Sequence, residues 1–189
     1  MPFNRPAFLQ AVFAPRADER VLVLVDQRTD NCPDHPDWQA RRAMAPAWGQ
    51  VLAALGADYL GMLTYPATGA NNGDLPAHGL LHGRPVAMAQ SLAAADLVLA
   101  LTEYSATAPL LAAIRASGGR LRAASLPGVL PRMETTALTV DVPRLARRVA
   151  YLRAALDQAV GAQLVFSTGH QVYFDLRHRQ AHGDDGRLP

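Results

Sequence analysis

The stretch RVLVLVD, residues Arg20–Asp26, decides the fold that this sequence predicts. Its five consecutive apolar residues end at an aspartate, and such a compact apolar run is typical of a strand buried on both faces of a parallel sheet. Three further strand-like runs follow: YLGMLTY at 59–65, DLVLALT at 96–102 and RLRAAS at 120–125. We therefore expect Val21–Val25 to lie inside a parallel sheet and not at an exposed antiparallel edge.

Helical segments separate these strands. The predicted helices lie at 37–58, 85–95, 108–119 and 142–160. Asp37 is expected to cap the first helix, and Pro46 to kink or split it. A long loop over 66–84, rich in Gly, Asn, Pro and His, leads to the second helix, with Pro85 in its first turn. Thr107 is expected to cap the third helix.

Strand and helix alternate four times along the chain. This order predicts an α/β fold, a doubly wound and mostly parallel sheet of four to five strands with flanking helices. Asp141 caps an amphipathic helix that precedes the run QLVFSTGHQVYFDLR at 163–177. That run predicts a C-terminal β-hairpin with a tight Gly-His turn. We assign a Rossmann-like α/β domain to residues 1–162 and the hairpin region to 163–189.

Composition narrows the classes of function. The formal net charge is +2, and the charges are dispersed, with no basic stripe interleaved with aromatic residues, so we expect no nucleic-acid partner. The chain contains no lysine, which excludes Schiff-base chemistry, a pyridoxal phosphate linkage and a lysine-containing phosphate loop. A single cysteine, Cys32, favours a reducing compartment, and no apolar segment is long enough to span a bilayer. We expect a cytoplasmic protein with no membrane partner.

The loops that follow the strands hold the candidate functional residues, because ligands of open α/β sheets collect at the carboxyl ends of the strands. Four loops qualify, at 26–37, 66–84, 102–107 and 125–133. The candidate residues come from the loops at 26–37 and 102–107, which are rich in acids, hydroxyls and an imidazole. For the loop at 26–37 the alternatives are a solvated capping loop and a metal site. For the loop at 102–107 the alternative is helix capping with a buried tyrosine. The substrate-cleft candidates are Asp30, His35, Thr102, Glu103, Tyr104 and Ser105.

Two histidine pairs have the four-residue spacing of helical metal ligands: His78 with His82, and His178 with His182. Neither pair lies on a predicted helix, so we expect surface histidines in both cases. The chain also lacks the GxGxxG, GxSxG and HExxH motifs of nucleotide-binding, hydrolase and zinc-peptidase sites. We therefore assign no catalytic residue and no metal ligand within this chain.

Several stretches together resemble one known superfamily. They are SLAAADLVLALTEYS at 91–105, ASGGRLRAASLPGVLPRM at 116–133 and GAQLVFSTGHQVYFDLRHRQAHGDDG at 161–186. This pattern resembles the N-terminal domain shared by aminopeptidase T, a leucyl aminopeptidase family, and 2,5-dihydroxypyridine 5,6-dioxygenase. The PGVLPRM segment is closer to the dioxygenase side. The similarity covers most of the chain from about Arg20 onward.

The resemblance implies the N-terminal α/β half of a 2,5-dihydroxypyridine 5,6-dioxygenase-like metalloenzyme, which supplies substrate-cleft walls and assembly surface. In those families the acidic turn corresponding to 184–186 leads into a second domain that carries the metal ligands. The resemblance therefore implies no cofactor in this chain, and iron or zinc in a missing second domain. The corresponding half of a metal-dependent leucyl aminopeptidase stays open, as does a non-catalytic small-ligand binding or interaction module.

The same resemblance implies partners for the chain. We expect either a homo-oligomer or a separately encoded metal-binding half, in addition to a small-molecule substrate. The apolar face of the hairpin around Val172, Phe174 and Leu176 is expected to need such cover, because exposed apolar surface drives association.

Overall fold

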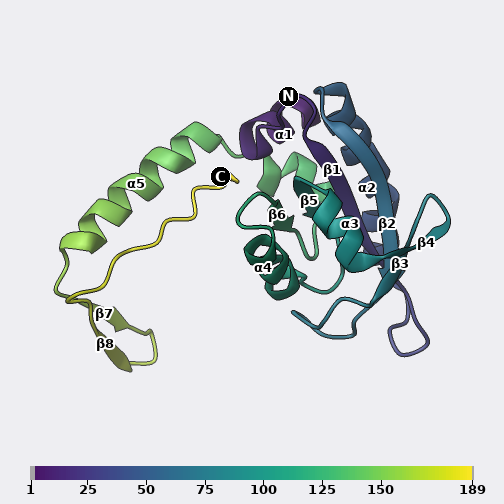
Figure 1. The fold of residues 1–189 in the computed structure, drawn as a ribbon. Helices are drawn as coiled ribbons and strands as arrows, with labels where there is room; N and C mark the ends of the chain where they lie inside the picture. Colours follow the sequence, from purple (N-terminus) through teal and green to yellow (C-terminus); the bar gives the residue numbers. More distant parts are fainter. Residues whose placement is uncertain (1–2, 189) are drawn as a thin grey trace. The chain divides into compact units, whose positions relative to one another are not determined.

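A computed structural model describes residues 3–188 of the chain (Figure 1). Contacts divide these residues into two compact units, residues 3–139 together with Leu188, and Val140–Arg187. Each unit is described by itself below. The predicted domain boundary after residue 162 stays a prediction.

The first unit contains six strands, four α-helices and two short 3-10 helices among its described residues. Its elements in chain order are α1 (Arg5–Phe13), β1 (Arg20–Gln27), α2 (Pro36–Ala54), β2 (Asp58–Pro66), β3 (His78–Leu81), β4 (Arg84–Ala87), α3 (Met88–Ala94), β5 (Leu97–Ala100), α4 (Thr107–Ala116), β6 (Arg122–Ser125), η1 (Pro131–Thr135) and η2 (Ala137–Thr139).

The six strands form one mixed sheet in the order β4-β3-β2-β1-β5-β6. Strands β2, β1, β5 and β6 are mutually parallel, while β3 and β4 add to the β2 edge in antiparallel pairing. The predicted α/β class and the mostly parallel sheet are confirmed. The predicted strand number of four to five is wrong, because the sheet has six strands.

The two additional strands come from the segment predicted as a loop and from the start of the predicted second helix. Pro85 lies in strand β4, and the helix begins only at Met88. Close packing holds this hairpin on the sheet: a Cβ atom on Gly79 would lie 2.5 Å from Leu63 Cδ2 and 2.8 Å from the carbonyl oxygen of Thr64. Only glycine permits this approach, so tertiary contact overrides the weak local strand preference.

Both faces of β1 are buried, as predicted. Val21, Val23 and Val25 belong to a core with residues of α1 and α2. Leu22 and Leu24 belong to a second core with residues of α3 and α4. The sheet is therefore covered by helices on both faces around its central strands (Figure 1).

Helix α2 differs from the prediction at two positions. Its N-cap is His35, whose Nδ1 accepts a hydrogen bond from the backbone N–H of Trp38, so Asp37 lies in the first turn and is not the cap. Pro46 lies inside a helix assigned without interruption from Pro36 to Ala54. Buried Ala45 and Trp48 pack into the core beside it, which stabilises the helix despite the lost backbone donor.

The second unit contains α5 (Val142–Gln158), β7 (Gly161–Val165) and β8 (Gln171–Asp175). Asp141 caps α5 as predicted, accepting a hydrogen bond of 2.9 Å from the backbone N–H of Arg144. Strands β7 and β8 pair antiparallel in a sheet of their own, which confirms the C-terminal hairpin. Within residues 3–188, no helix combines the length and the apolar character needed to cross a bilayer.

Candidate functional site

The carboxyl end of β1 lies at the point where the direction of the chain through the sheet reverses. From β1 the chain passes through α2 to β2 on one side, and it later returns past β1 to β5 and β6 on the other. Such a switch point between two parallel strands opens the crevice in which α/β proteins usually bind ligands. The side chains at the ends of β1 and β5 therefore decide whether a ligand can enter.

The carboxylate of Asp26 fills this position. It accepts hydrogen bonds from the indole Nε1 of Trp38 at 2.9 Å and from the backbone N–H groups of Glu103 and Tyr104 at 2.9 and 3.1 Å. Asp26 is only 1% exposed. Burial raises the pKa of this carboxyl above its ordinary value, and the three hydrogen bonds oppose that rise only in part.

A second set of contacts surrounds Glu103. Its Oε2 lies 2.5 Å from Nη1 of Arg41, which is 2% exposed, and its Oε1 lies 3.1 Å from Nε2 of His35. Because Nδ1 of His35 accepts the capping hydrogen bond of α2, Nε2 is the nitrogen that donates to Glu103. Partial burial opposes ionisation of Glu103, yet hydrogen bonds from Arg41 and His35 lower its pKa.

The loop after β2 is fastened to the start of α4. Ser105 donates its backbone N–H to Asn71 Oδ1 at 2.8 Å, and the backbone N–H of Ala108 donates to Asn72 Oδ1 at 3.0 Å. Asn72 thus does the capping that was expected of Thr107, which is the first residue of the helix. The amide groups at this helix start are occupied by protein atoms.

The structure brings most of the predicted site residues together. His35, Glu103, Tyr104 and Thr102 lie around Asp26 or in the loop that contacts it, and Thr102 Oγ1 donates to the carbonyl oxygen of Tyr104 at 2.7 Å. Ser105 contacts the asparagine loop. Asp30 does not join them: it is exposed in the turn between Thr29 and Cys32. Their assignment as a substrate cleft stays a prediction, because these polar groups bind mainly one another.

An open cleft lies on the other side of β1. It has a volume of about 430 Å³ and is bounded by the end of β1, the end of β2 and the β3–β4 hairpin. Arg28, Thr64, His78, Leu80 and Pro85 are among its lining residues, and we call it the edge cleft. Asp26 and the residues that bind it are not among the lining residues of this cleft.

Sequence reasoning missed Asp26, Trp38 and Arg41 as the groups that close the switch point. Arg41 carries the available signal, because a charged residue on the apolar face of a helix needs a buried partner. The edge cleft gave no signal of this kind. It forms only when His78 and Leu80 are placed by a hairpin that the sequence pattern did not predict.

The family resemblance implies a metal in a second domain and no metal ligand in this chain. Residues 3–188 contain no cluster of three or more His, Cys, Asp or Glu side chains placed to hold a metal ion. All four histidines of the two pairs, His78, His82, His178 and His182, are exposed. We derive no metal-dependent step from this chain.

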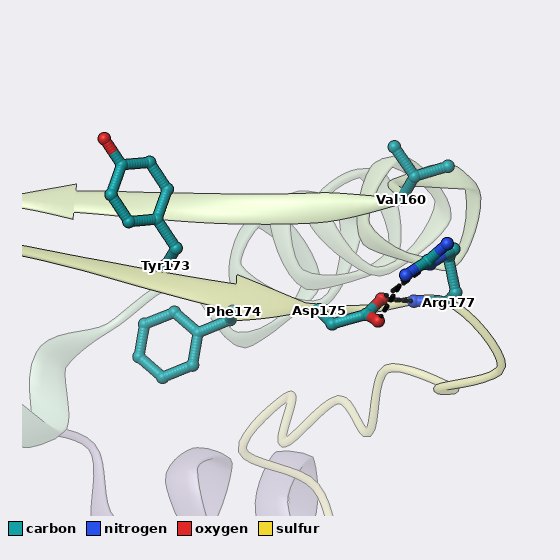
Figure 2. Close-up of a pocket in the computed structure, with 5 residues that line it drawn as sticks. All are labelled: Val160, Tyr173, Phe174, Asp175 and Arg177. Atoms are coloured by element: carbon teal, nitrogen blue, oxygen red, sulfur yellow. Dashed lines mark hydrogen bonds and ion pairs between the residues drawn. The ribbon is translucent and has the colours of Figure 1, made fainter.

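The hairpin of the second unit carries a shallow hollow that we do not assign as a ligand site. Figure 2 shows Tyr173 and Phe174 projecting to opposite faces of the hairpin, with Asp175 and Arg177 paired at 2.8 Å. Tyr173 is 70% exposed and Phe174 is 46% exposed. The hollow is therefore open apolar surface, not an enclosed pocket.

A scan against models of protein families, a search of curated proteins and a search of solved structures found no match to this chain.

Replacing Asp26 by Asn tests its role. Asn keeps one acceptor oxygen but turns an amide donor toward the donors of Trp38, Glu103 or Tyr104. We expect the free energy of unfolding to fall by about 1–3 kcal/mol, measured by urea denaturation. The exposed Asp30→Asn variant is the control and should change it by less than about 0.5 kcal/mol. Equal stability of the two variants would contradict the assignment.

Glu103→Gln tests the ion pair with Arg41. The variant leaves a buried guanidinium with a neutral partner, so unfolding near neutral pH should cost about 1–3 kcal/mol less than in the wild type. The folded-state pKa of Glu103 is lowered from 4.5, so the stabilisation of the folded state by ionised Glu103 is complete above pH 4.5. It is lost as the pH falls through the lower folded-state pKa. Urea denaturation across this acid range measures the difference, and a difference that persists undiminished at about pH 2 would overturn the assignment.

Proposed function

We propose that this chain is the α/β half of a cytoplasmic, metal-dependent enzyme similar to 2,5-dihydroxypyridine 5,6-dioxygenase. It contributes walls of the substrate cleft and an assembly surface, and the metal ligands come from protein outside the described residues. The proposal rests on the sequence resemblance, which is strongest in the segments at 91–105, 116–133 and 161–186.

The observation that carries the proposal is the position of the segment with the dioxygenase-like pattern. Residues 127–133 follow β6, and Val129 and Leu130 within them are buried. The carbonyl oxygen of Val129 accepts a hydrogen bond of 2.9 Å from Nε of Arg41. Arg41 in turn pairs with Glu103, so this segment supports the carboxyl edge of the sheet, where substrates of α/β enzymes bind.

The second unit supports the assembly part of the proposal. On α5 the apolar side chains of Tyr151, Leu152 and Leu156 are exposed, as are Val172 and Phe174 on the hairpin. A two-stranded hairpin is only marginally stable without cover, and apolar surface of this extent marks interaction sites. A further domain or a partner polypeptide would cover these side chains.

Metal content and turnover test the enzymatic part. We expect the purified chain to hold no stoichiometric metal and to leave 2,5-dihydroxypyridine intact with added ferrous iron, because residues 3–188 contain no cluster of metal ligands. Adding the polypeptide of a neighbouring reading frame that encodes the ligand-bearing half should restore ring opening. Restored hydrolysis of leucyl substrates with zinc or cobalt would indicate the aminopeptidase alternative. No turnover of either kind of substrate would indicate a binding module. One metal per chain, lost in a His178→Ala, His182→Ala double variant, would contradict the proposal.

Sedimentation tests the assembly surface. Without its partner, the chain should self-associate at tens of micromolar through the exposed apolar residues of the second unit. Phe174→Asp should shift it toward the monomer, because a desolvated carboxylate opposes burial. Leu111→Asp is the matched control, since Leu111 is similarly exposed on α4 and should not alter the sedimentation profile. A wild-type chain that sediments as a monomer would count against the surface.

A further inference from the structure

We propose that the edge cleft binds a small aromatic monocarboxylate, with its carboxylate on Arg28 and its ring against Leu80 and Pro85. The inference concerns a site at the end of β1 and β2 that the sequence pattern did not predict. It does not rest on the metalloenzyme assignment, because every residue it uses belongs to this cleft in the first unit.

The apolar wall follows from the strand register. Thr64 of β2 pairs with Leu80 of β3, and Leu80 pairs with Pro85 of β4. Directly paired residues of antiparallel strands project to the same face, so these three side chains stand in a row across the sheet. Leu80 is nevertheless 47% exposed. The row therefore offers a flat apolar surface against which a ring can pack, with the hydroxyl of Thr64 at one end.

The charged end of the cleft is held in place by the backbone on both sides of Arg28. The carbonyl oxygen of Gln27 accepts a hydrogen bond of 2.9 Å from the backbone N–H of Ala67. Thr29 and Cys32 exchange two backbone hydrogen bonds of 3.1 Å each. The Arg28 backbone is thus fixed between two anchored residues, which lowers the entropy cost of presenting its guanidinium to a ligand.

The charges of the cleft select an anion. Arg28 makes no hydrogen bond or ion pair with any residue in the range 3–188, and no carboxylate is among the lining residues. His78 adds an imidazole at the β3 side. A guanidinium binds a carboxylate through two parallel hydrogen bonds, so the planar anion fits the Arg28 fork.

Size and polarity narrow the ligand further. A volume of about 430 Å³ lies in the lower range of small-molecule sites and accommodates a single ring with its substituent. The single guanidinium of Arg28 can bind one carboxylate, and the apolar side chains of Leu80 and Pro85 can pack against one ring. Inorganic phosphate has no apolar part for Leu80 and Pro85, so it should bind more weakly than an aromatic carboxylate.

Titration with benzoate tests the site. Calorimetry measures the affinity, and backbone amide shifts in NMR spectra locate the binding site. We expect saturable binding with the largest shifts at Thr64, Gly79 and Leu80. Benzamide, the neutral analogue, should bind about tenfold more weakly or worse, because it lacks the charge-assisted hydrogen bonds that a carboxylate accepts from Arg28. Inorganic phosphate should also bind more weakly than benzoate, because it has no ring to pack against Leu80 and Pro85. Benzoate that causes no shifts around the cleft, or that binds no better than benzamide, would overturn the inference.

Variants separate the two ends of the cleft. Arg28→Gln should weaken benzoate about tenfold and leave benzamide unchanged, whereas Leu80→Glu should abolish benzoate binding by placing a like charge on the apolar row. Arg84→Gln is the matched control, because Arg84 is exposed on β4 and does not line the cleft. Arg28, Leu80 and Arg84 are all exposed, so the three variants should fold, and circular dichroism verifies this. Benzoate affinity unaffected by Arg28→Gln in a folded variant would disprove the role of Arg28. None of these outcomes depends on dioxygenase or peptidase turnover.

Discussion

The buried carboxylate of Asp26 is the constraint around which the carboxyl edge of the sheet is organised. Burying a charge is costly, and the raised pKa of Asp26 records that cost. The cost is offset because one carboxylate joins three segments: β1, the start of α2 through Trp38, and the loop after β5 through two backbone N–H groups. An apolar residue at this position would leave those three donors without acceptors.

This arrangement determines where a ligand can bind. Ligands of open α/β sheets usually bind in the crevice at the switch point. Here Asp26 accepts from two backbone N–H groups of the loop after β5, and Glu103 is occupied by Arg41 and His35. The polar groups of Asp26 and Glu103 between β1 and β5 are consequently paired with protein atoms. The proposed carboxylate site therefore lies in the edge cleft on the β2 side of β1, where Arg28 has no protein partner within residues 3–188.

The sequence predicted those elements whose local pattern and tertiary environment agree. The apolar run of β1 and the Asp141 cap are examples, since each follows from a few adjacent residues. The proximity of His35 and Glu103 was predictable because parallel strands end at one edge. The contacts of Glu103 with His35 and Arg41 were not predictable, because they depend on how α2 packs against the sheet. Strands β3 and β4 escaped prediction because each has four residues and their pairing needs Gly79 against β2.

The unpredicted hairpin also explains why a cleft exists at this edge. Helix α2 packs on β1 and β2, so strands added beyond β2 extend the sheet past the helix that covers it. Leu80 remains half exposed as a result, although it stands directly beside Thr64 in the ladder. The antiparallel addition therefore creates an apolar surface, and the anchored turn after β1 places a cation at its end. Shape and charge of the edge cleft thus have separate structural origins, one in β3–β4 and one in the loop after β1.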